Sequence, residues 1–245
     1  MTTPVKRTST DSDMRFTAPL YTYAEAARAL DIPSSTLATW VKGYVRRPRG
    51  RNAVTVAPTV TSFPAGRGEP AVPFVGLAEA MVLAAVRSSG VSLQRVRPAL
   101  EVLARKIGSE HALASRALQT DGAELLFDYA QHASSEEAKA ANELTVVRSG
   151  QRVFRDLIVE YMQRIDYAAD GYARLIRLPA YERAEVVVDP TRSFGQPIFA
   201  HGAARVSDVL DRFSAGDDIE TLVAEFGVPA AEIDDALCAA SRRAA

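Results

Sequence analysis

Cysteine, histidine and long apolar runs are scarce in this 245-residue chain. Cys238 is the one cysteine, so an intrachain disulfide is excluded and a reducing compartment is the natural environment. The longest apolar-rich run, 77–86, is too short to span a bilayer and contains Glu79. The N-terminus is polar and lacks a signal-peptide pattern. We therefore expect a soluble, cytoplasmic protein with no membrane contact.

The side chains of metal and catalytic sites are also thinly spread. His111, His132 and His201 lie far apart, and none has a neighbour at metal-ligand spacing, so each is predicted to be a surface or hydrogen-bonded histidine. Gly66 and Gly68 lack the Gly-Lys that completes a phosphate-binding loop. No arrangement of serine, histidine and aspartate can be argued from the sequence. We expect no enzyme activity, no cofactor and no metal.

Charge is segregated along the chain, although the net charge is only −1. Residues 1–75 carry ten Lys and Arg against five Asp and Glu, whereas residues 180–245 carry six against twelve. The segment between them is balanced. A basic head and an acidic end suggest two different partners, with a chance fluctuation of composition as the alternative.

The most informative stretch is 21–51, which reads as two short helices joined by a tight turn. Thr22 and Glu25 fit a capping box at the start of the first helix. Pro33 interrupts that helix, and Ser34 or Ser35 can cap the second. The inner side of the second helix has apolar residues at helical spacing, namely Leu37, Trp40, Val41 and Tyr44.

The outward side of the second helix carries small or polar residues and one lysine, and a run of arginines follows it. This combination suits a major groove flanked by phosphates. The alternative is an ordinary helical hairpin with a solvated basic loop. The predicted DNA-binding residues are Ser35, Thr36, Thr39, Lys42, Arg46, Arg47, Arg49, Arg51 and Arg67.

A wing is predicted after the arginine run. Segments 53–63 and 71–75 read as extended, and a turn rich in Pro and Gly separates them, which would place Arg67 at the tip of a β-hairpin. A helix over 76–88 follows. The next helix begins at Ser92 and contains Pro98, which is expected to bend it or delay its start. Its apolar stripe fits a core or a dimer seam and consists of Leu93, Val96, Leu100, Leu103 and Ile107.

The helix-turn-helix, the wing and the segment VPFVGLAEAMVLAAVRSSGVSLQRVRPAL, in this order, resemble MerR-type winged-helix regulators over roughly 21–107. In that family the wing leads into a helix, and the motif "R..GVSL..IR" opens the next one. The chain departs from the best-known members because it lacks a long C-terminal dimerisation helix and an effector cysteine cluster. The resemblance therefore implies DNA binding but not metal sensing.

Weaker patterns follow in the middle of the chain. Two short helices are expected at 111–118 and 123–130, broken by residues 120–122. Residues 131–142 are rich in Ala, Glu, Ser and Lys and are predicted to be a linker. A small mixed α/β connector should then span 143–183, with a hairpin turn at Ser149-Gly150.

The C-terminal region, 184–245, has a more specific pattern. Two extended segments flank a turn at Asp189, and three helices follow, of which the last two form a second helix-turn-helix around 227–229. Cys238 is expected in the core, and Asp234 and Asp235 on a solvated face. The region resembles the VapB-type antitoxin domain, long labelled as of unknown function, through Asp189, Pro190, Gly195, Pro197, Arg205, Val206, Val209, Leu210, Gly216, Phe226, Ile233 and Leu237.

A MerR-like head joined to such a module resembles the longer mycobacterial and actinobacterial VapB antitoxins, which pair with PIN-type VapC ribonucleases. The resemblance implies that the head binds operator DNA and represses its own operon, while the C-terminal part binds the cognate VapC-like toxin. A homodimer or a larger toxin–antitoxin hetero-oligomer is expected. The candidate toxin-binding residues are Arg205, Phe226, Arg242 and Arg243. The last two could compete with a toxin metal ion, or could be a frayed basic helix end favoured by the helix dipole.

The expected architecture is mainly α with small β elements. It comprises a flexible arm (1–18), a MerR-like winged helix-turn-helix head (19–130), the linker, the connector, and an antitoxin domain (184–245) built from a β-hairpin and a helix-turn-helix. Two other functions stay open. One is a MerR-like regulator that responds to a small-molecule effector through its C-terminal part, and the other is an assembly adaptor without a DNA role.

Overall fold

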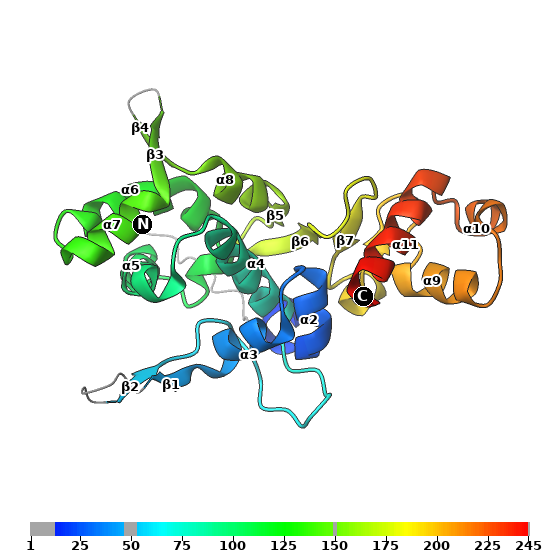
Figure 1. The fold of residues 1–245 in the computed structure, drawn as a ribbon, viewed down its shortest axis with the longest axis horizontal. Coiled ribbons are helices and arrows are strands. Elements are labelled where there is room, and N and C mark those ends of the chain that lie inside the picture. The colour runs from blue at the N-terminus through cyan, green and yellow to red at the C-terminus, as the bar shows by residue number, and fades with distance from the viewer. Residues whose placement is uncertain (1–12, 47–52, 149–150, 245) are drawn as a thin grey trace, which may run out of the picture.

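The computed structural model describes residues 13–46, 53–148 and 151–244. Within them the chain is mainly helical with small antiparallel sheets, as predicted (Figure 1). In chain order the helices are α1 (Met14–Thr17), α2 (Tyr23–Ala29), α3 (Ser34–Lys42), α4 (Phe74–Ser88), α5 (Leu93–Ile107), the 3-10 turn η2 (Ala112–Ala114), α6 (Arg116–Ala130), α7 (Ser135–Glu143), α8 (Asp156–Gln163), η3 (Ser193–Gly195), α9 (Val206–Ser214), α10 (Ile219–Phe226) and α11 (Ala230–Ala244).

The strands form two hairpins and one larger sheet within the described residues. The first hairpin pairs β1 (Tyr44–Arg46) with β2 (Val54–Val56), and the second pairs β3 (Thr145–Arg148) with β4 (Gln151–Phe154). The sheet has the order β5 (Ile165–Tyr167), β6 (Ala173–Arg177), β7 (Val186–Val188) and β8 (Ile198–Phe199). Its β6–β7 pairing joins the predicted connector to the predicted antitoxin domain by backbone hydrogen bonds.

Helix α4 runs through the centre of the molecule, and every residue from Phe74 to Val86 is buried. It contacts α1, α8, η2 and β6, which explains why its sequence is apolar on all sides. Its one buried charge, Glu79, accepts a hydrogen bond from the Thr61 N–H at 2.6 Å and lies 3.0 Å from His111 Nδ1. These partners offset the cost of burying a carboxylate, and they make His111 a hydrogen-bonded core-edge residue.

The layer of α5, α6 and α7 differs from the sequence prediction in two places. Residues 131–142 are not a linker, because α7 begins in them and buries Ala140 and Ala141 against α5 and α6. The predicted break at 120–122 is also wrong, since α6 runs through it. Gly122 is needed for close packing: a Cβ there would lie 2.8 Å from the Phe154 ring. The alanines of α7 and the glycine of α6 are therefore small residues at close packing contacts, rather than signs of a linker or a helix break. Helix α5 tolerates Pro98 within its length.

The predicted flexible arm is ordered from Asp13 onward, and residues 1–12 lie outside the described chain. Phe16 is buried, with its ring 5.3 Å from that of His111 and 5.2 Å from that of Tyr172. Arg15 forms ion pairs with Asp13 and Asp170. Phe16 thus anchors this segment between the head and the connector, and Arg15 joins it to the connector.

The C-terminal module packs α9, α10 and α11 around a small apolar core of Val209, Leu222 and Ile233. The two helices of the predicted second helix-turn-helix are present. Cys238 is exposed rather than buried, because the buried stripe of α11 passes through Ala236 and Ala239 instead. Asp235 also differs from the prediction, because it is buried rather than solvated.

Asp235 has this position because its carboxylate accepts hydrogen bonds from the backbone. The amides of Glu182, Arg183 and Ala184 all donate to its Oδ2, at 2.8, 2.8 and 2.9 Å. Burial disfavours the charge, but the three N–H groups outweigh it and lower the pKa of Asp235 below its usual range. The carboxylate therefore ties α11 to the chain entering β7.

Candidate nucleic-acid and partner interfaces

Helices α2 and α3 form the helix-turn-helix that the sequence predicted. Both hydrogen bonds of the capping box are present: the Glu25 N–H donates to Thr22 Oγ1 at 3.1 Å, and the Thr22 N–H donates to Glu25 Oε2 at 2.8 Å. Asp31 makes the turn with a φ of 54°. Pro33 occupies the N-cap of α3, so neither Ser34 nor Ser35 caps it. Leu37, Trp40 and Val41 are buried as predicted.

The wing is a different hairpin from the one predicted. Tyr44 does not continue α3 but pairs with Val56 at the base of the β1–β2 hairpin. Gly43 permits this change of direction, because its φ is 65° and an added Cβ would lie 2.2 Å from the Val56 carbonyl oxygen. The arginine run therefore connects two strands. Arg47, Arg49 and Arg51 lie outside the described residues, as does the side chain of Arg46.

The outward face of α3 presents most of the polar residues expected there. Ser35, Thr39 and Lys42 are exposed, whereas Thr36 is half-buried. The Thr39 hydroxyl donates to the Ser35 carbonyl at 2.8 Å, so its methyl group and lone pairs are what it can offer a ligand. Lys42 Nζ lies 5.4 Å from the centre of the Tyr23 ring.

Arg67 is not at the tip of a hairpin. It belongs to the loop 64–70, which with α2 and α3 lines a hollow of about 880 Å³ that also includes Ser35 and Lys42. Glu69 lines the same hollow and accepts a hydrogen bond from the Gly66 N–H at 2.7 Å. The structure thus brings three predicted DNA-binding residues together on one face, although by a loop rather than a wing.

Two further arginines lie beside this face, and the list of DNA-binding candidates omitted them. Arg87, at the end of α4, donates to Thr36 Oγ1 at 2.6 Å. Arg97, on α5, donates to the Ala57 carbonyl at the base of the wing at 2.5 Å. They are the first and last arginines of RSSGVSLQRVR, residues 87–97. Both could therefore have been chosen from the segment that resembles MerR-type regulators. Arg87 thus supports α3 of the helix-turn-helix, and Arg97 supports the base of the wing.

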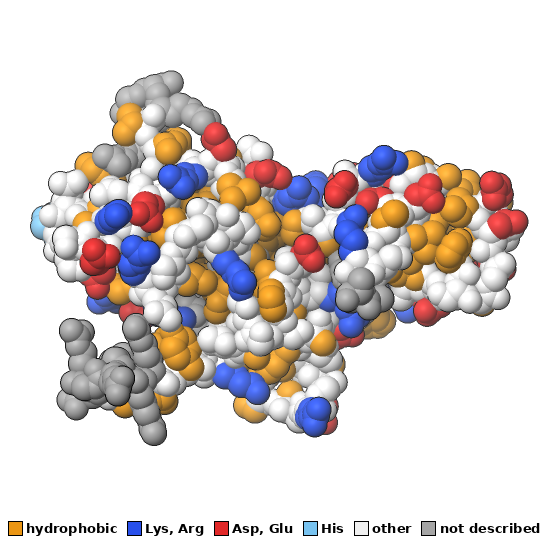
Figure 2. All heavy atoms as spheres, in the orientation of Figure 1, with side chains coloured by type: hydrophobic (Ala, Val, Ile, Leu, Met, Phe, Trp, Pro, Cys, Tyr) orange, Lys and Arg blue, Asp and Glu red, His pale blue; other side chains and the backbone are white. Residues whose placement is uncertain are grey.

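The candidate toxin-binding residues lie on the C-terminal module. Figure 2 shows acidic side chains gathered over this end, around α9, α10 and α11. Arg205 is exposed directly before α9, and Phe226 is half-buried at the end of α10. Gly202 packs on the Phe226 carbonyl, where an added Cβ would lie 2.3 Å away, so the loop before Arg205 contacts α10.

Arg242 lies elsewhere on the C-terminal module. On α11, it reaches the Ala180 carbonyl at 3.4 Å and Glu182 at 4.0 Å. The side chain of Arg243 lies outside the described set. The described contacts therefore bring the loop before Arg205 to Phe226 through Gly202, but leave Arg242 beside a different segment of the chain.

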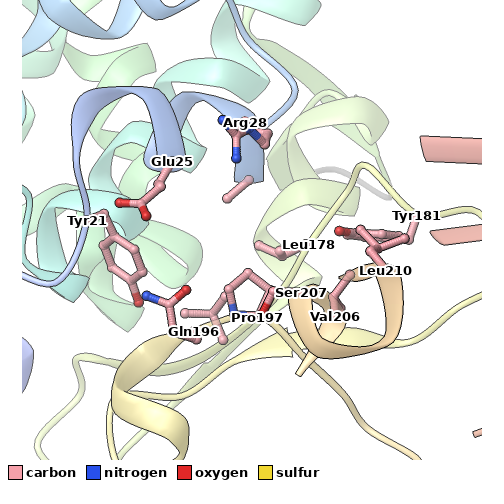
Figure 3. A pocket seen from close by; sticks show the side chains of 12 residues that line it. Tyr21, Glu25, Arg28, Leu178, Tyr181, Gln196, Pro197, Val206, Ser207 and Leu210 are labelled. Carbon is pink, nitrogen blue, oxygen red and sulfur yellow. The ribbon is translucent and has the colours of Figure 1, made fainter. Parts of the chain in front are cut away.

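The head and the C-terminal module meet at Tyr21. Its hydroxyl donates to the carbonyl of Gly195 in η3 at 2.9 Å, while its backbone pairs with Val72. Burial raises the pKa of Tyr21, and nearby Asp189 and Glu25 reinforce the effect. A hollow of about 230 Å³ lies beside this contact, between α2 and the C-terminal module (Figure 3).

Comparisons with known proteins agree with this arrangement. A family model described as "Putative DNA-binding HTH domain" matches residues 19–100, and one described as "Protein of unknown function (DUF433)" matches residues 186–238. The chain is 46% identical to "Putative antitoxin VapB45" of Mycobacterium tuberculosis over 92% of its own length and 95% of that protein. It belongs to the VapB45 antitoxin family.

One solved structure and one further protein of Mycobacterium tuberculosis are also similar. The X-ray crystal structure of Rv2018 superposes with a TM-score of 0.81 at 43% identity, covering 91% of this chain and 99% of that one. The uncharacterized protein Rv2308 is 26% identical over 92% of this chain and 93% of its own length. Both likenesses extend over the whole VapB45-like architecture, from the head to the C-terminal module.

Family membership confirms the recognition of a VapB-type antitoxin and of a helix-turn-helix head. The match to the DNA-binding family ends at Leu100, so it includes α2, α3, the β1–β2 wing, α4 and half of α5. The DUF433 match begins with β7 and covers most of α11. No group of three or more His, Cys, Asp and Glu arranged to hold a metal occurs in the described part of this VapB45 relative. None of its described helices is long and apolar enough to cross a membrane.

Proposed function

We propose that this protein is the antitoxin of a type II toxin–antitoxin system, which neutralises a VapC-like PIN-type ribonuclease and represses its own operon. The observation that carries the proposal is the likeness to the antitoxin VapB45, which spans 92% of the chain and includes both the DNA-binding head and the C-terminal module. A relative that matched only one end would support only one of these roles. The protein itself is assigned no catalytic step.

The DNA-binding role rests on the exposed face of α3 and the wing beside it. Ser35, Thr39 and Lys42 point outward, with Arg67 in the adjoining loop. One helix of nine residues reaches few base edges, so we expect a dimer on a pseudo-palindromic operator with half-sites about one helical turn, or roughly 34–36 Å, apart. The arginines between β1 and β2 would supply phosphate contacts, which position the head without reading sequence.

The toxin-binding role rests on the C-terminal module. Residues 180–245 carry twelve acidic against six basic residues, which opposes binding to phosphates and favours a protein partner for the second helix-turn-helix. Arg205 and Phe226 would contact the toxin surface. PIN-type nucleases resembling VapC use an acidic cluster with a divalent metal, and Arg242 or Arg243 would compete with that cation. The contacts of Arg242 with Ala180 and Glu182 are long and exposed, so releasing the side chain costs little.

The proposal is tested by expressing the full chain with the PIN-type nuclease encoded beside its gene. Coexpression should restore growth that the nuclease alone stops, and an affinity tag on this chain should recover the nuclease. The purified chain should also retard a fragment of its own promoter, and footprinting should show two half-sites. Growth arrest that persists during coexpression would remove the antitoxin role. Failure to retard the promoter, with growth restored, would remove only the repressor role.

A further inference from the structure

The hollow at the junction of head and C-terminal module needs both parts of the chain (Figure 3). One wall is the face of α2 that carries Glu25, Arg28 and Ala29. The opposite wall comes from the chain after β6, from β7, from the segment before β8 and from α9. At about 230 Å³ it is smaller than the range of about 300–1,000 Å³ typical of drug-sized ligands, so it suits a small metabolite.

One wall of the hollow carries two opposite charges on adjacent turns of α2. Arg28 is exposed, and its guanidinium has no hydrogen bond or ion pair among the described residues. Glu25 uses Oε2 for the Thr22 N–H, and Oε1 receives no hydrogen bond from the described chain. Residues three apart on a helix have Cβ atoms about 5–6 Å apart, so a cation and an anion start from neighbouring positions on the same wall without forming an ion pair with each other. Figure 3 shows both side chains on the side of α2 that faces the hollow.

The rest of the lining is apolar apart from a few polar groups. Leu178, Val188 and Val206 are buried and form a fixed floor, with Pro197 half-buried beside them. The Gln196 amide and the Ser207 hydroxyl stand at the edge. Such a surface accepts a short aliphatic chain, because burying a methylene there removes apolar area from water without leaving a polar group unpaired.

We propose that this hollow binds an α-amino acid with an aliphatic side chain, such as leucine. The carboxylate of the ligand would pair with Arg28, its ammonium would pair with Glu25 Oε1, and its side chain would lie on the apolar floor. A zwitterion matches both charges at once, whereas a simple carboxylate would be repelled by Glu25. The proposal does not depend on the antitoxin role, because it concerns binding by the chain alone.

A bound amino acid would bridge the first helix of the helix-turn-helix to β7 and α9. The same two parts are already joined by the hydrogen bond from Tyr21 to Gly195, which lies beside the hollow. The ligand would therefore stabilise the junction and raise the melting temperature of the full chain.

The test is isothermal titration calorimetry of the full-length protein with L-leucine, 4-methylpentanoate and 3-methylbutylamine. The second compound lacks the ammonium group and the third lacks the carboxylate. Leucine should bind and raise the melting temperature. Each analogue should bind about tenfold or more weakly, as expected when one charge-assisted hydrogen bond is lost. No heat of binding with millimolar leucine, or equal affinity for 4-methylpentanoate, overturns the assignment.

Variants locate the site. Arg28→Gln removes an exposed charge and Glu25→Gln keeps a residue that still completes the capping box, so both should fold and both should weaken leucine binding about tenfold or more. Ser207→Tyr adds bulk at an exposed edge position and should abolish binding by filling the hollow. Arg105→Gln, an exposed change on α5, is the matched control and should leave affinity unchanged. Leucine binding that survives Arg28→Gln and Ser207→Tyr would lie elsewhere and would overturn the proposal.

Discussion

The hydroxyl of Tyr21 donates a hydrogen bond to the carbonyl of Gly195, 174 positions later in the chain, at 2.9 Å. Tyr21 directly precedes the capping box of the helix-turn-helix, and Gly195 lies in η3, between β7 and β8 of the C-terminal module. Both residues are buried. This bond therefore joins the part of the molecule assigned to DNA with the part assigned to the toxin.

Replacing Tyr21 with Phe should lower the free energy of unfolding by about 1–3 kcal/mol, because it leaves the buried Gly195 carbonyl without its donor. Tyr23→Phe is the matched control. Tyr23 is half-buried and its ring contact with Lys42 is kept, so the free energy of unfolding should change by no more than about 0.5 kcal/mol. Gly195→Ala should be costly as well, since its φ is 74° and a Cβ would lie 2.5 Å from the Tyr21 hydroxyl oxygen.

Gly195→Ala should lower the free energy of unfolding by less in a Tyr21→Phe background than in the wild type, because the Tyr21 hydroxyl oxygen with which the new Cβ would clash is absent. Urea denaturation of the two single variants and the double variant measures this coupling. Strictly additive costs would show that the Tyr21–Gly195 contact is not formed.

Asp235→Asn should lower the free energy of unfolding by roughly 2–3 kcal/mol at pH 7, because a carboxylate that accepts three N–H groups is replaced by a weaker, neutral acceptor. The pKa of Asp235 is depressed in the folded protein. Its charge therefore stabilises the fold above the unfolded pKa of about 3.9, and that stabilisation is lost as pH falls below this value.

The difference in stability between wild type and Asp235→Asn should accordingly shrink in acid, as followed by thermal unfolding from neutral pH down to pH values below the unfolded pKa. Asp234→Asn, one position away on α11 but exposed, is the control and should change stability little at any of these pH values. Equal effects of the two substitutions would contradict the burial of Asp235.

Thr39→Ala should weaken binding to operator DNA more than binding to random DNA, by about 1–3 kcal/mol if the side chain contacts a base. The hydroxyl hydrogen is engaged by the Ser35 carbonyl, so the methyl group and the oxygen lone pairs would read the base. Competition binding with both DNAs measures the difference. Equal losses on both would show that α3 only positions the backbone.

Lys42→Ala should weaken binding to every DNA sequence alike and reduce the slope of log K against log salt by about 1, because it removes one phosphate contact. Lys139→Ala changes a lysine on α7, away from the helix-turn-helix, and should leave the slope unchanged. A salt slope unaffected by Lys42→Ala would place this lysine outside the DNA interface.

Much of the fold could be read from the sequence where one local signal agreed with the tertiary structure. The capping box at Thr22 and Glu25 and the apolar face of α3 each correspond to a described element. The strands β3 and β4 are present on either side of the predicted turn, whose residues Ser149 and Gly150 lie outside the described chain. Errors arose where the reason for a residue lies far along the chain. Gly122 reads as a helix break, yet it makes room for the Phe154 ring.

The candidate sites show the same division. The position of α3 followed from local spacing, but the wing was misplaced, because the strand that returns past Gly43 is visible only in three dimensions. Asp235 read as an exposed helix charge, since nothing nearby in sequence reveals the three amides at 182–184. Arg87 and Arg97 could have been chosen from their motif, whereas their contacts with Thr36 and Ala57 could not.

The central claim is that the C-terminal module of the full-length chain inhibits a PIN-type ribonuclease independently of DNA binding. The most direct measurement is the RNA-cleaving activity of the purified nuclease as the full chain is titrated into it. We predict inhibition that saturates at a stoichiometric ratio, is retained by Lys42→Glu, and is weakened by Arg205→Glu, which changes an exposed residue before α9. Ribonuclease activity that persists in an excess of the wild-type chain would contradict the account.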